Sequence, residues 1–308
     1  MNIGINGTGL VQSASVQRVI DHALQAERDG FKSYWLAEHP TGGFDAMTVL
    51  ALVGQAVQEM ELGTAVIPLQ PRHPIALAGQ ALTTANAMKT RFTLGVGLSH
   101  EIMMAQLGIG FEKPIRQLKE SLNLLVPLLE AGEVMASGEM LSGDAQFFGG
   151  KPAKSIQVVV AALGPQALGV AGRQSAGTTL AWVGPKTVRE HIVPRLSDAA
   201  ASAGRGAPRV IATLPVCVTD DEETVRAAIG RGLKMYATLP SYRAMFEKEG
   251  VAGPGELAIV GSKAQCEDGI QAMLEAGVTD FAASEYYLNP EEKALTRSLL
   301  KHMAAPEH

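Results

Sequence analysis

The chain has little of several features that mark particular protein classes. Its 308 residues include only two cysteines, Cys217 and Cys266, which form neither a disulfide framework nor a metal-ligand spacing. The net charge is −5 and no long basic run occurs, so there is no electrostatic footprint for a nucleic acid or an anionic membrane. No stretch approaches 18 uncharged apolar residues, and the start lacks the basic and apolar regions of a secretory signal. We therefore expect a soluble cytoplasmic protein that binds neither nucleic acid nor membrane.

Common nucleotide and hydrolase signatures are also missing. The sequence has no G-x-x-x-x-G-K-[ST], no G-x-G-x-x-G after its first strand and no G-x-S-x-G. These absences argue against a P-loop, a dinucleotide-binding open sheet and a serine hydrolase elbow. With 46% hydrophobic residues, the chain can still bury a large core.

What the sequence does contain is a regular alternation of strand and helix patterns. Short apolar runs predict eight strands, over Asn2–Asn6, Ser33–Ala37, Glu61–Ile67, Phe92–Val96, Ile156–Ala161, Thr178–Trp182, Val210–Val218 and Asp280–Ala283. Between them, apolar periodicity with Gly or Pro at the ends predicts helices over Val16–Arg28, Ala46–Val57, Ile75–Met88, Ile115–Glu130, Gln166–Ala176, Val188–Ser202, Glu222–Tyr236 and Ala264–Ala276, with a last helix opened by Pro290. This alternation favours an α/β fold, a (β/α)8 TIM barrel, as a single domain over residues 1–308.

Two segments depart from the plain repeat. Residues 133–148 contain short apolar runs around Ser137-Gly138 and Ser142-Gly143, which predict a β-hairpin or another ordered excursion. Residues 237–260 carry several aromatic residues and a glycine-rich loop. Because barrels build their sites from loops after the strands, we expect both insertions at the C-terminal rim, where they shape the substrate pocket.

The ends of the second and fourth strands carry candidate catalytic residues. Glu38 and His39 follow the second strand, where they can donate a proton or hold a heterocycle; a structural histidine capping the loop is the alternative. Gly97 and His100 follow the fourth strand, where glycine lets the backbone approach a flat ligand closely. His39, His73 and His100 raise the question of a metal site, but no Asp or Glu recurs at ligand spacing, so we expect none.

The fifth unit predicts an anion site. The chain passes from its strand through Gly164 and Pro165 directly into a helix. Proline at the first helical position leaves the amides of Gln166, Ala167 and Leu168 free at the positive end of the helix dipole, where a phosphate can bind. An ordinary tight turn with proline at this position is the alternative.

Taken in order, the motifs resemble those of one family. They are WLAEH (residues 35–39), LGTAVIP (62–68), RHPIALAGQALT (72–83), RFTLGVGLSH (91–100) and AALGPQALGVAGRQSAGTT (161–179). This combination is similar to the luciferase-like flavin and deazaflavin oxidoreductases, over nearly the whole chain, and is most similar to their F420-dependent branch. The resemblance implies a TIM barrel that holds coenzyme F420, or alternatively FMN, at its C-terminal mouth, in a homodimer.

The resemblance also implies roles for individual residues. A cis peptide at Ala65-Val66 would form a bulge behind the ring, and His39 would lie beside the ring. Gly97, Leu98 and Ser99 would follow the edge or side chain of the cofactor. Gly164, Pro165, Gln166 and Ala167 would receive its phosphate, in agreement with the helix-terminus argument.

Some positions depart from the family's sugar-phosphate dehydrogenases. Glu38 replaces an aspartate, and His100 replaces an acidic residue after the strand-four glycines. These changes argue against sugar-phosphate oxidation, while His100 could exchange a proton with the substrate. We therefore expect F420-dependent hydride transfer to or from a small, partly apolar organic substrate.

Three other functions remain open at this stage. The first is an FMN-dependent monooxygenase that uses O2, and the second is a flavin-binding barrel without turnover. The third is an unrelated metabolic barrel such as an aldolase or isomerase, although the strand ends supply no lysine for it.

Overall fold

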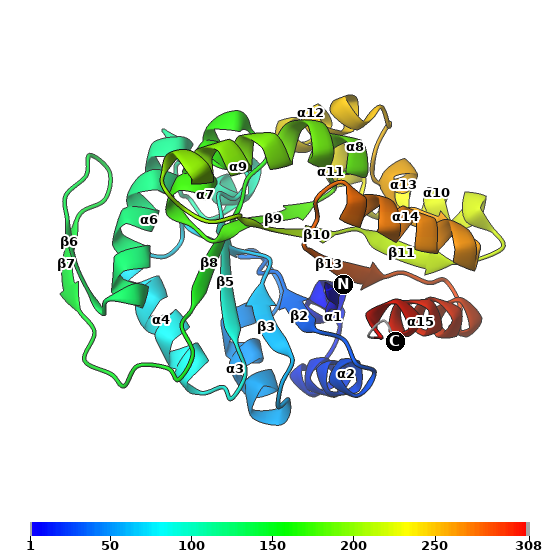
Figure 1. Cartoon of the computed structure of the whole chain (residues 1–308), viewed down its shortest axis with the longest axis horizontal. Helices are drawn as coiled ribbons and strands as arrows, with labels where there is room; N and C mark the ends of the chain where they lie inside the picture. Colours follow the sequence, from blue (N-terminus) through cyan, green and yellow to red (C-terminus); the bar gives the residue numbers. More distant parts are fainter. Residues whose placement is uncertain (1, 306–308) are drawn as a thin grey trace.

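The computed structural model describes residues 2–305, and these form a closed barrel of parallel strands surrounded by helices (Figure 1). The barrel closes because the first strand pairs with the last, in register from Asn2↔Asp280 to Ile5↔Ala283. In spatial order the strands are β1 (Asn2–Asn6), β2 (Ser33–Leu36), β3 (Glu61–Thr64), β5 (Phe92–Gly97), β8 (Gln157–Ala161), β9 (Gly177–Ala181), β10 (Arg209–Thr213) and β13 (Asp280–Glu285). The predicted TIM barrel and all eight of its strands are confirmed.

Two strands that the sequence predicted as continuous are split. The first becomes β3 and β4 (Ile67–Pro68), separated by Ala65 and Val66. The second becomes β10 and β11 (Pro215–Val218), and β11 pairs with both β13 and β12 (Ile259–Gly261). Apolar runs alone do not reveal such interruptions, because the residues at the breaks are themselves apolar.

The predicted helices occur, but two are interrupted. Residues 188–192 of the predicted Val188–Ser202 helix form a π-helix, and the predicted Glu222–Tyr236 helix breaks at Leu233. The helices are α2 (Val16–Arg28), α3 (Ala46–Ala56), α4 (Pro74–Asn86), α6 (Pro114–Glu130), α7 (Pro165–Gln174), α9 (Val193–Ser202), α10 (Glu222–Gly232), α14 (Lys263–Glu275) and α15 (Pro290–Ala304). Ser262 and Gln265 form a capping box at α14. The sequence did not predict the short helices α1 (Thr8–Ser13), α5 (Glu101–Gln106) and α8 (Pro185–Thr187), because such segments are too short to show a helical period.

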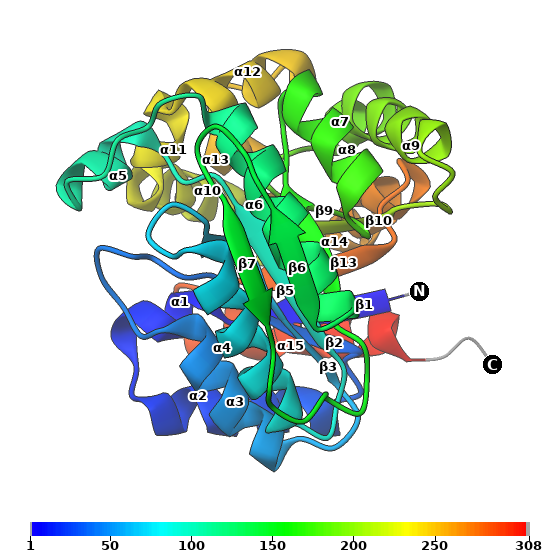
Figure 2. The same ribbon diagram turned by 90° about the vertical axis from the view of Figure 1, so that its left-hand side faces the viewer.

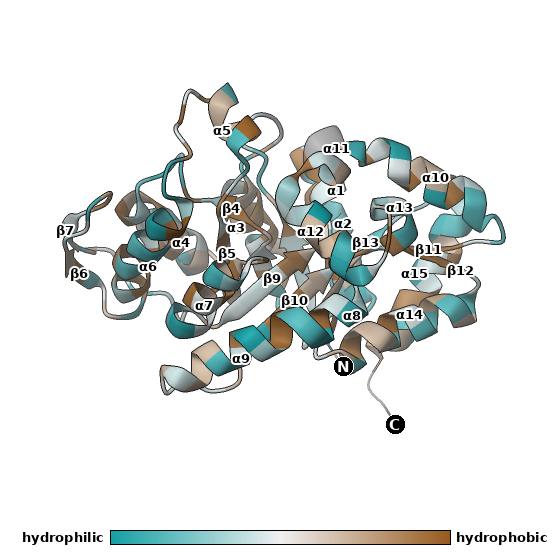
Figure 3. Ribbon diagram, turned by 90° about the horizontal axis from the view of Figure 1, so that it is seen from above, coloured by the Kyte–Doolittle hydropathy of each residue, from teal (hydrophilic) through white to brown (hydrophobic). Residues whose placement is uncertain are grey.

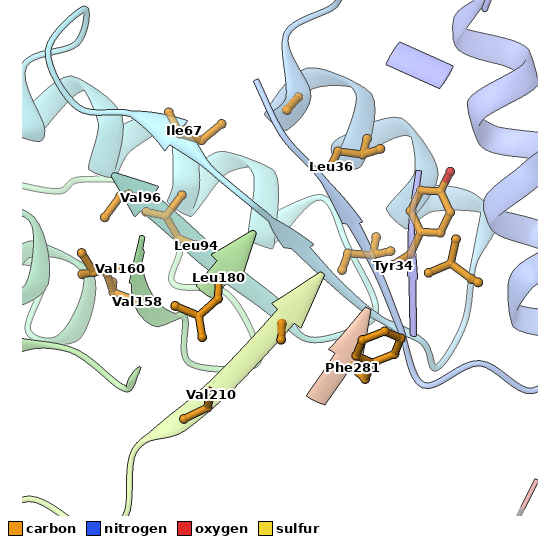
Figure 4. Packing of buried hydrophobic residues seen from close by; sticks show 14 of the residues in the cluster. Tyr34, Leu36, Ile67, Leu94, Val96, Val158, Val160, Leu180, Val210 and Phe281 are labelled. Atoms are coloured by element: carbon orange, nitrogen blue, oxygen red, sulfur yellow. The ribbon is translucent and has the colours of Figure 1, made fainter. Parts of the chain in front are cut away.

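Alternation along each strand divides the core into two layers. Tyr34 and Leu36 belong to the large cluster between strands and helices, part of which Figure 4 shows. Trp35 points the other way and joins a small cluster inside the barrel with Val159, Ile211 and Ala282. The helices correspondingly carry hydrophobic and hydrophilic residues side by side (Figure 3). The barrel interior is thus packed with side chains and is not a channel.

A charged network closes the barrel at the end where the strands begin. Arg209 opens β10, and its guanidinium reaches the first residues of three other strands, Glu61 at 2.9 Å, Gln157 at 2.9 Å and Asp280 at 2.8 Å. Burial lowers the pKa of Arg209, but the hydrogen bonds to Asp280 and Glu61 outweigh it and leave that pKa raised. We call Arg209, Glu61, Gln157 and Asp280 the barrel floor.

The first excursion is the predicted hairpin. Strands β6 (Glu133–Ala136) and β7 (Gly143–Gln146) pair antiparallel and lie along the outer face of α6 (Figure 2). The Glu120 carboxylate of α6 accepts hydrogen bonds from three backbone amides of the turn, those of Glu139, Met140 and Leu141. The body of the hairpin therefore covers a helix, and its turn is fixed to the first half of α6.

The second excursion is helical and ends in a strand. It comprises α11 (Lys234–Thr238), α12 (Pro240–Glu249), α13 (Pro254–Leu257) and β12. Figure 2 shows α11 and α12 on the same side of the molecule as α5, which follows β5. This side is the mouth, the end of the barrel at which the strands finish.

Both cysteines are free and buried, as expected for structural thiols. Cys266 donates a hydrogen bond to the Cys217 carbonyl oxygen at 3.4 Å. Burial raises the pKa of Cys217 to about 12 and that of Cys266 to about 11, so both remain protonated at neutral pH. Within residues 2–305, no helix is both long and apolar enough to cross a membrane.

Candidate active site

Four neighbouring strands bring most of the predicted site residues to one side of the mouth. The spatial order β2, β3, β5, β8 places His39, Val66, Ser99 and Gly164 after successive strands, with β4 continuing the line of β3. Parallel strands finish at the same end of a barrel, so these residues share one side of the mouth. The predicted convergence of the sites is therefore present.

The chain bulges between β3 and β4. The Ala65-Val66 peptide is cis, at the position that the family resemblance implied. Two hydrogen bonds fix the bulge to the end of β2. The Ala65 amide donates to the Leu36 carbonyl at 2.8 Å, and the Val66 carbonyl accepts from the Glu38 amide at 3.0 Å. Ala65 and Val66 are both partly exposed, so they remain accessible from the mouth.

The glycines of β5 make room for this bulge. A Cβ at Gly95 would lie 1.9 Å from the Thr64 carbonyl oxygen, and one at Gly97 would lie 3.1 Å from Val66 Cγ2 and 2.9 Å from Ala161 Cβ. Both glycines are buried. Within the fold, the lack of a side chain at Gly97 leaves room for Val66 and Ala161. The role of Gly97 in binding the cofactor stays a prediction.

We expect Gly95→Ala to lower the free energy of unfolding by about 3 kcal/mol, because the added methyl group meets backbone that cannot withdraw. Urea denaturation measures this change. Gly79→Ala is the matched control, since Gly79 lies in α4 with nothing near its Cβ position, and there the substitution should stabilise by about 0.5–1 kcal/mol. Equal stability of the two variants would contradict the packing role of Gly95.

Glu38 is held in an ion pair that the sequence did not reveal. Its buried carboxylate accepts hydrogen bonds from both terminal nitrogens of Arg72, and the same guanidinium contacts Asp45 at 2.7 Å. Asp45 also caps α3 through the Thr48 amide at 2.7 Å. Glu38 therefore fixes the loop that carries His39, and its carboxylate faces Arg72. Arg72 stands in the quoted RHP segment, but nothing in that segment identifies its partners.

The two candidate histidines are half-buried and uncharged at neutral pH. Burial lowers the pKa of His39 and also that of His100. His39 follows β2, and His100 follows β5 at the start of α5. A neutral imidazole can accept a proton, so each histidine can act as a base at the mouth.

The second excursion reaches His100. The Tyr242 ring of α12 lies 5.5 Å from the His100 ring, and Tyr236 of α11 lies 5.4 Å from Tyr242. Trp182, the residue after β9, lies 5.2 Å from Tyr236. The sequence alone does not assign a role to these three aromatic residues.

Gln70 supplies an unused donor beside Ser99. The Ser99 amide donates to Gln70 Oε1 at 3.3 Å, while Gln70 Nε2 is buried and finds no partner in the part of the chain that the structure describes. A buried amide group normally has a partner. A ring carbonyl or ring nitrogen of a flavin-type cofactor would supply the missing acceptor, so these residues fit such a group. Gln70 was not predicted from the sequence.

The start of α7 has the geometry of an anion site. Gly164 is the N-cap in an extended conformation, Pro165 begins the helix, and no side chain caps it. Gly164, Pro165 and Gln166 are exposed while Ala167 is buried. The amide of Leu168 donates to the Gly164 carbonyl at 2.9 Å, which corrects the prediction that it is free. The open amides are those of Gln166 and Ala167.

His191 holds the backbone immediately before this site. Its Nε2 lies 2.8 Å from the Leu163 carbonyl oxygen, which belongs to the residue before Gly164. Burial is the main reason that the pKa of His191 is lowered, so the ring is neutral and can donate this hydrogen bond. This contact could not be predicted from the sequence, because His191 lies in a helix later in the chain.

Comparisons with known proteins give matches over most of the chain. The model of the luciferase-like monooxygenase family matches residues 3–280. An F420-dependent glucose-6-phosphate dehydrogenase of Nakamurella multipartita is 29% identical over 67% of this chain, and the match spans 65% of that relative's length. A 5,10-methylenetetrahydromethanopterin reductase of Methanolobus tindarius is 25% identical over 89% of this chain and 83% of its own.

Solved structures show the same fold. The coenzyme F420 dependent tetrahydromethanopterin reductase of Methanopyrus kandleri superposes with a TM-score of 0.81, at 20% identity over 97% of both chains. The oxygenating constituent of 3,6-diketocamphane monooxygenase from Pseudomonas putida, in complex with FMN, gives 0.77 at 17% identity, over 99% of this chain and 98% of its own.

Proposed function

The chain belongs to the luciferase-like monooxygenase family, a family of enzymes, and from this premise we propose that it is an F420-dependent oxidoreductase. It would transfer hydride between the deazaflavin and a small, partly apolar organic substrate. The observation that carries the proposal is the convergence of the Val66 bulge, the Gln70–Ser99 pair and the open start of α7 on neighbouring strand ends. The two sequence relatives named above, an F420-dependent glucose-6-phosphate dehydrogenase and a 5,10-methylenetetrahydromethanopterin reductase, support the choice of cofactor.

Each residue would have a distinct task. Val66 would lie behind the ring, and Gln70 Nε2 would donate to it. The amide of exposed Gly164 and those of Gln166 and Ala167 would bind the phosphate. When bound, the deazaflavin supplies the hydride acceptor or donor. His39 and His100, both neutral, would accept or return the proton of the substrate, and Glu38 would keep the His39 loop in place through Arg72.

Binding of the two cofactors tests the proposal. Purified protein should quench or shift the fluorescence of micromolar F420 and leave FMN unaffected. Tight FMN binding without F420 binding would overturn it.

We expect Gly164→Pro to weaken F420 affinity by roughly 10- to 100-fold, the cost of losing one hydrogen bond to a charged group. The φ of −78° at Gly164 suits proline, so the fold should persist, while the Gly164 amide is removed. Gly164→Ala keeps the amide and places its Cβ in open space, so it should bind F420 normally. Equal loss of affinity and of stability in Gly164→Pro would count against the phosphate assignment.

A second candidate is an FMN-dependent monooxygenase that uses O2. The same open helix start also suits the FMN phosphate, and the Pseudomonas putida neighbour was solved with FMN. Oxygen consumption coupled to a flavin reductase separates this candidate from the first. For either cofactor we propose a homodimer, which light scattering of the purified protein would test.

A further inference from the structure

An aromatic row crosses one side of the mouth. Trp182, Tyr236, Tyr242 and His100 follow one another with ring centroids 5.2, 5.4 and 5.5 Å apart and interplanar angles of 40°, 80° and 49°. These are the spacings and tilts of attractive aromatic pairs. His100 follows β5 and Trp182 follows β9, and β8 lies between these two strands. The row therefore passes the end of β8, the strand that leads to Gly164.

Buried neighbours hold the aromatic row in place. Trp182 is 9% exposed and adopts a left-handed φ of 61°, which a bulky residue avoids unless its surroundings hold it there. Leu239, which joins α11 to α12, is buried, as are Met245 and Phe246 of α12. Burial raises the pKa of both Tyr236 and Tyr242, so neither ring is charged at neutral pH. These rings form a fixed apolar surface.

The polar tips of the row are unused. Across residues 2–305, neither the Tyr236 hydroxyl nor the Tyr242 hydroxyl has a hydrogen-bond partner, although tyrosine hydroxyls in buried positions normally have one. Both tyrosines are partly exposed. The row can therefore contact an apolar group with its faces and a hydroxyl or carbonyl with its tips.

Two cations near the candidate site already have acidic partners. The row contains no charged side chain. Arg72, which holds the His39 loop, is neutralised by Glu38 and Asp45, and Lys113 at the start of α6 is paired with Glu139. A phosphate would find these cations already engaged.

We propose that Trp182, Tyr236 and Tyr242 form a substrate-binding wall beside His100, which selects an uncharged molecule with an apolar ring or branched alkyl group and one oxygen. Tyr242 also positions the His100 imidazole. This inference rests on the proposed oxidoreductase function and names the substrate class of the same site.

Tryptophan fluorescence tests the wall directly. The chain has two tryptophans, and the other one, Trp35, is sealed in the barrel interior with its Nε1 donating to Ser33 at 2.8 Å. Titration of the F420-loaded protein with cyclohexanol should change the emission of Trp182, and glucose 6-phosphate should not. The cyclohexanol signal should disappear in Trp182→Phe, which leaves Trp35 as the background.

Variants of the tyrosines complete the test. Tyr236→Ala and Tyr242→Ala should each weaken cyclohexanol binding roughly tenfold, the value of one apolar contact, while Tyr242→Phe keeps the ring and loses less. Phe148→Ala, which removes an exposed ring after the hairpin, should change nothing. Two results would contradict the proposed wall. One is a change in Trp182 emission with glucose 6-phosphate but not with cyclohexanol, and the other is an unchanged cyclohexanol affinity in both alanine variants.

The same samples separate this inference from the proposed function. F420 affinity, measured by the fluorescence of the cofactor, should be unaffected by Tyr236→Ala. If the unmodified protein does not bind F420, the proposed function itself is contradicted. If it binds F420 but cyclohexanol does not change the emission of Trp182, only the proposed substrate-binding wall is contradicted.

Discussion

Replacing Arg209 by methionine should lower the free energy of unfolding by about 3–5 kcal/mol, the typical cost of removing one partner from a buried ion pair. The guanidinium bonds Asp280 at 2.8 Å and Glu61 at 2.9 Å, and the side chain is only 19% exposed. Without it, the Asp280 carboxylate would lose its counter-charge, and Glu61 would keep only the longer ion pair with exposed Arg91 at 3.5 Å. Urea denaturation followed by circular dichroism gives the change.

A surface arginine is the matched control. Arg243 lies on α12 with its side chain 62% exposed and pairs with Glu247 at 3.9 Å. Exposed pairs of this kind contribute little, so Arg243→Met should change stability by less than about 0.5 kcal/mol. A similar small effect at Arg209 would mean that the floor is not a stabilising network.

The largest effect on turnover is expected at His100. Replacing it by glutamine should lower kcat by roughly 10²- to 10⁴-fold, the usual contribution of a general acid or base, without changing F420 affinity. Glutamine keeps a polar side chain but cannot carry the proton. His73→Gln is the control, because exposed His73 only caps α4, accepting from the Ile75 amide at 3.3 Å.

The pH profile gives a second measure of the same residue. Burial lowers the pKa of His100 below its ordinary 6.5, so the neutral base persists to a lower pH than a free histidine would allow. In the direction that releases a substrate proton, activity should therefore fall only below about pH 6.5. If kcat and its pH profile are the same in His100→Gln as in the unmodified enzyme, His100 does not carry the proton.

Protonation of the same histidine also affects the fold. The unfolded chain binds the proton more readily than the folded chain, because the folded pKa of His100 is the lower one. Its contribution to stability is thus present above pH 6.5 and is lost as the pH falls toward the folded pKa. His39 and His191 act in the same direction, since burial lowers the pKa of both.

Local patterns were enough to predict the barrel. Strand β1 and helix α2 begin and end at the residues that apolar periodicity and capping residues indicate. The turn residues of segment 133–148 likewise predicted its hairpin. These features depend on neighbours in the chain, which the sequence displays directly.

Side-chain partners across the fold could not be predicted in this way. Arg72 and Glu38 are 34 positions apart, and Arg209 and Glu61 are 148 apart. Each pair forms because two strand ends or loops meet in space, and no short motif marks it. For the same reason the sequence indicated His100 as a site residue but not its contact with Tyr242, which comes from a later excursion.

The packed interior has a kinetic consequence. Trp35 fills the barrel and Arg209 closes its lower end, so nothing can pass through from below. For the proposed oxidoreductase function, cofactor and substrate would then enter and leave through the same open end of the barrel. We expect the molecule that binds deeper to enter first and leave last, which would make binding and release ordered.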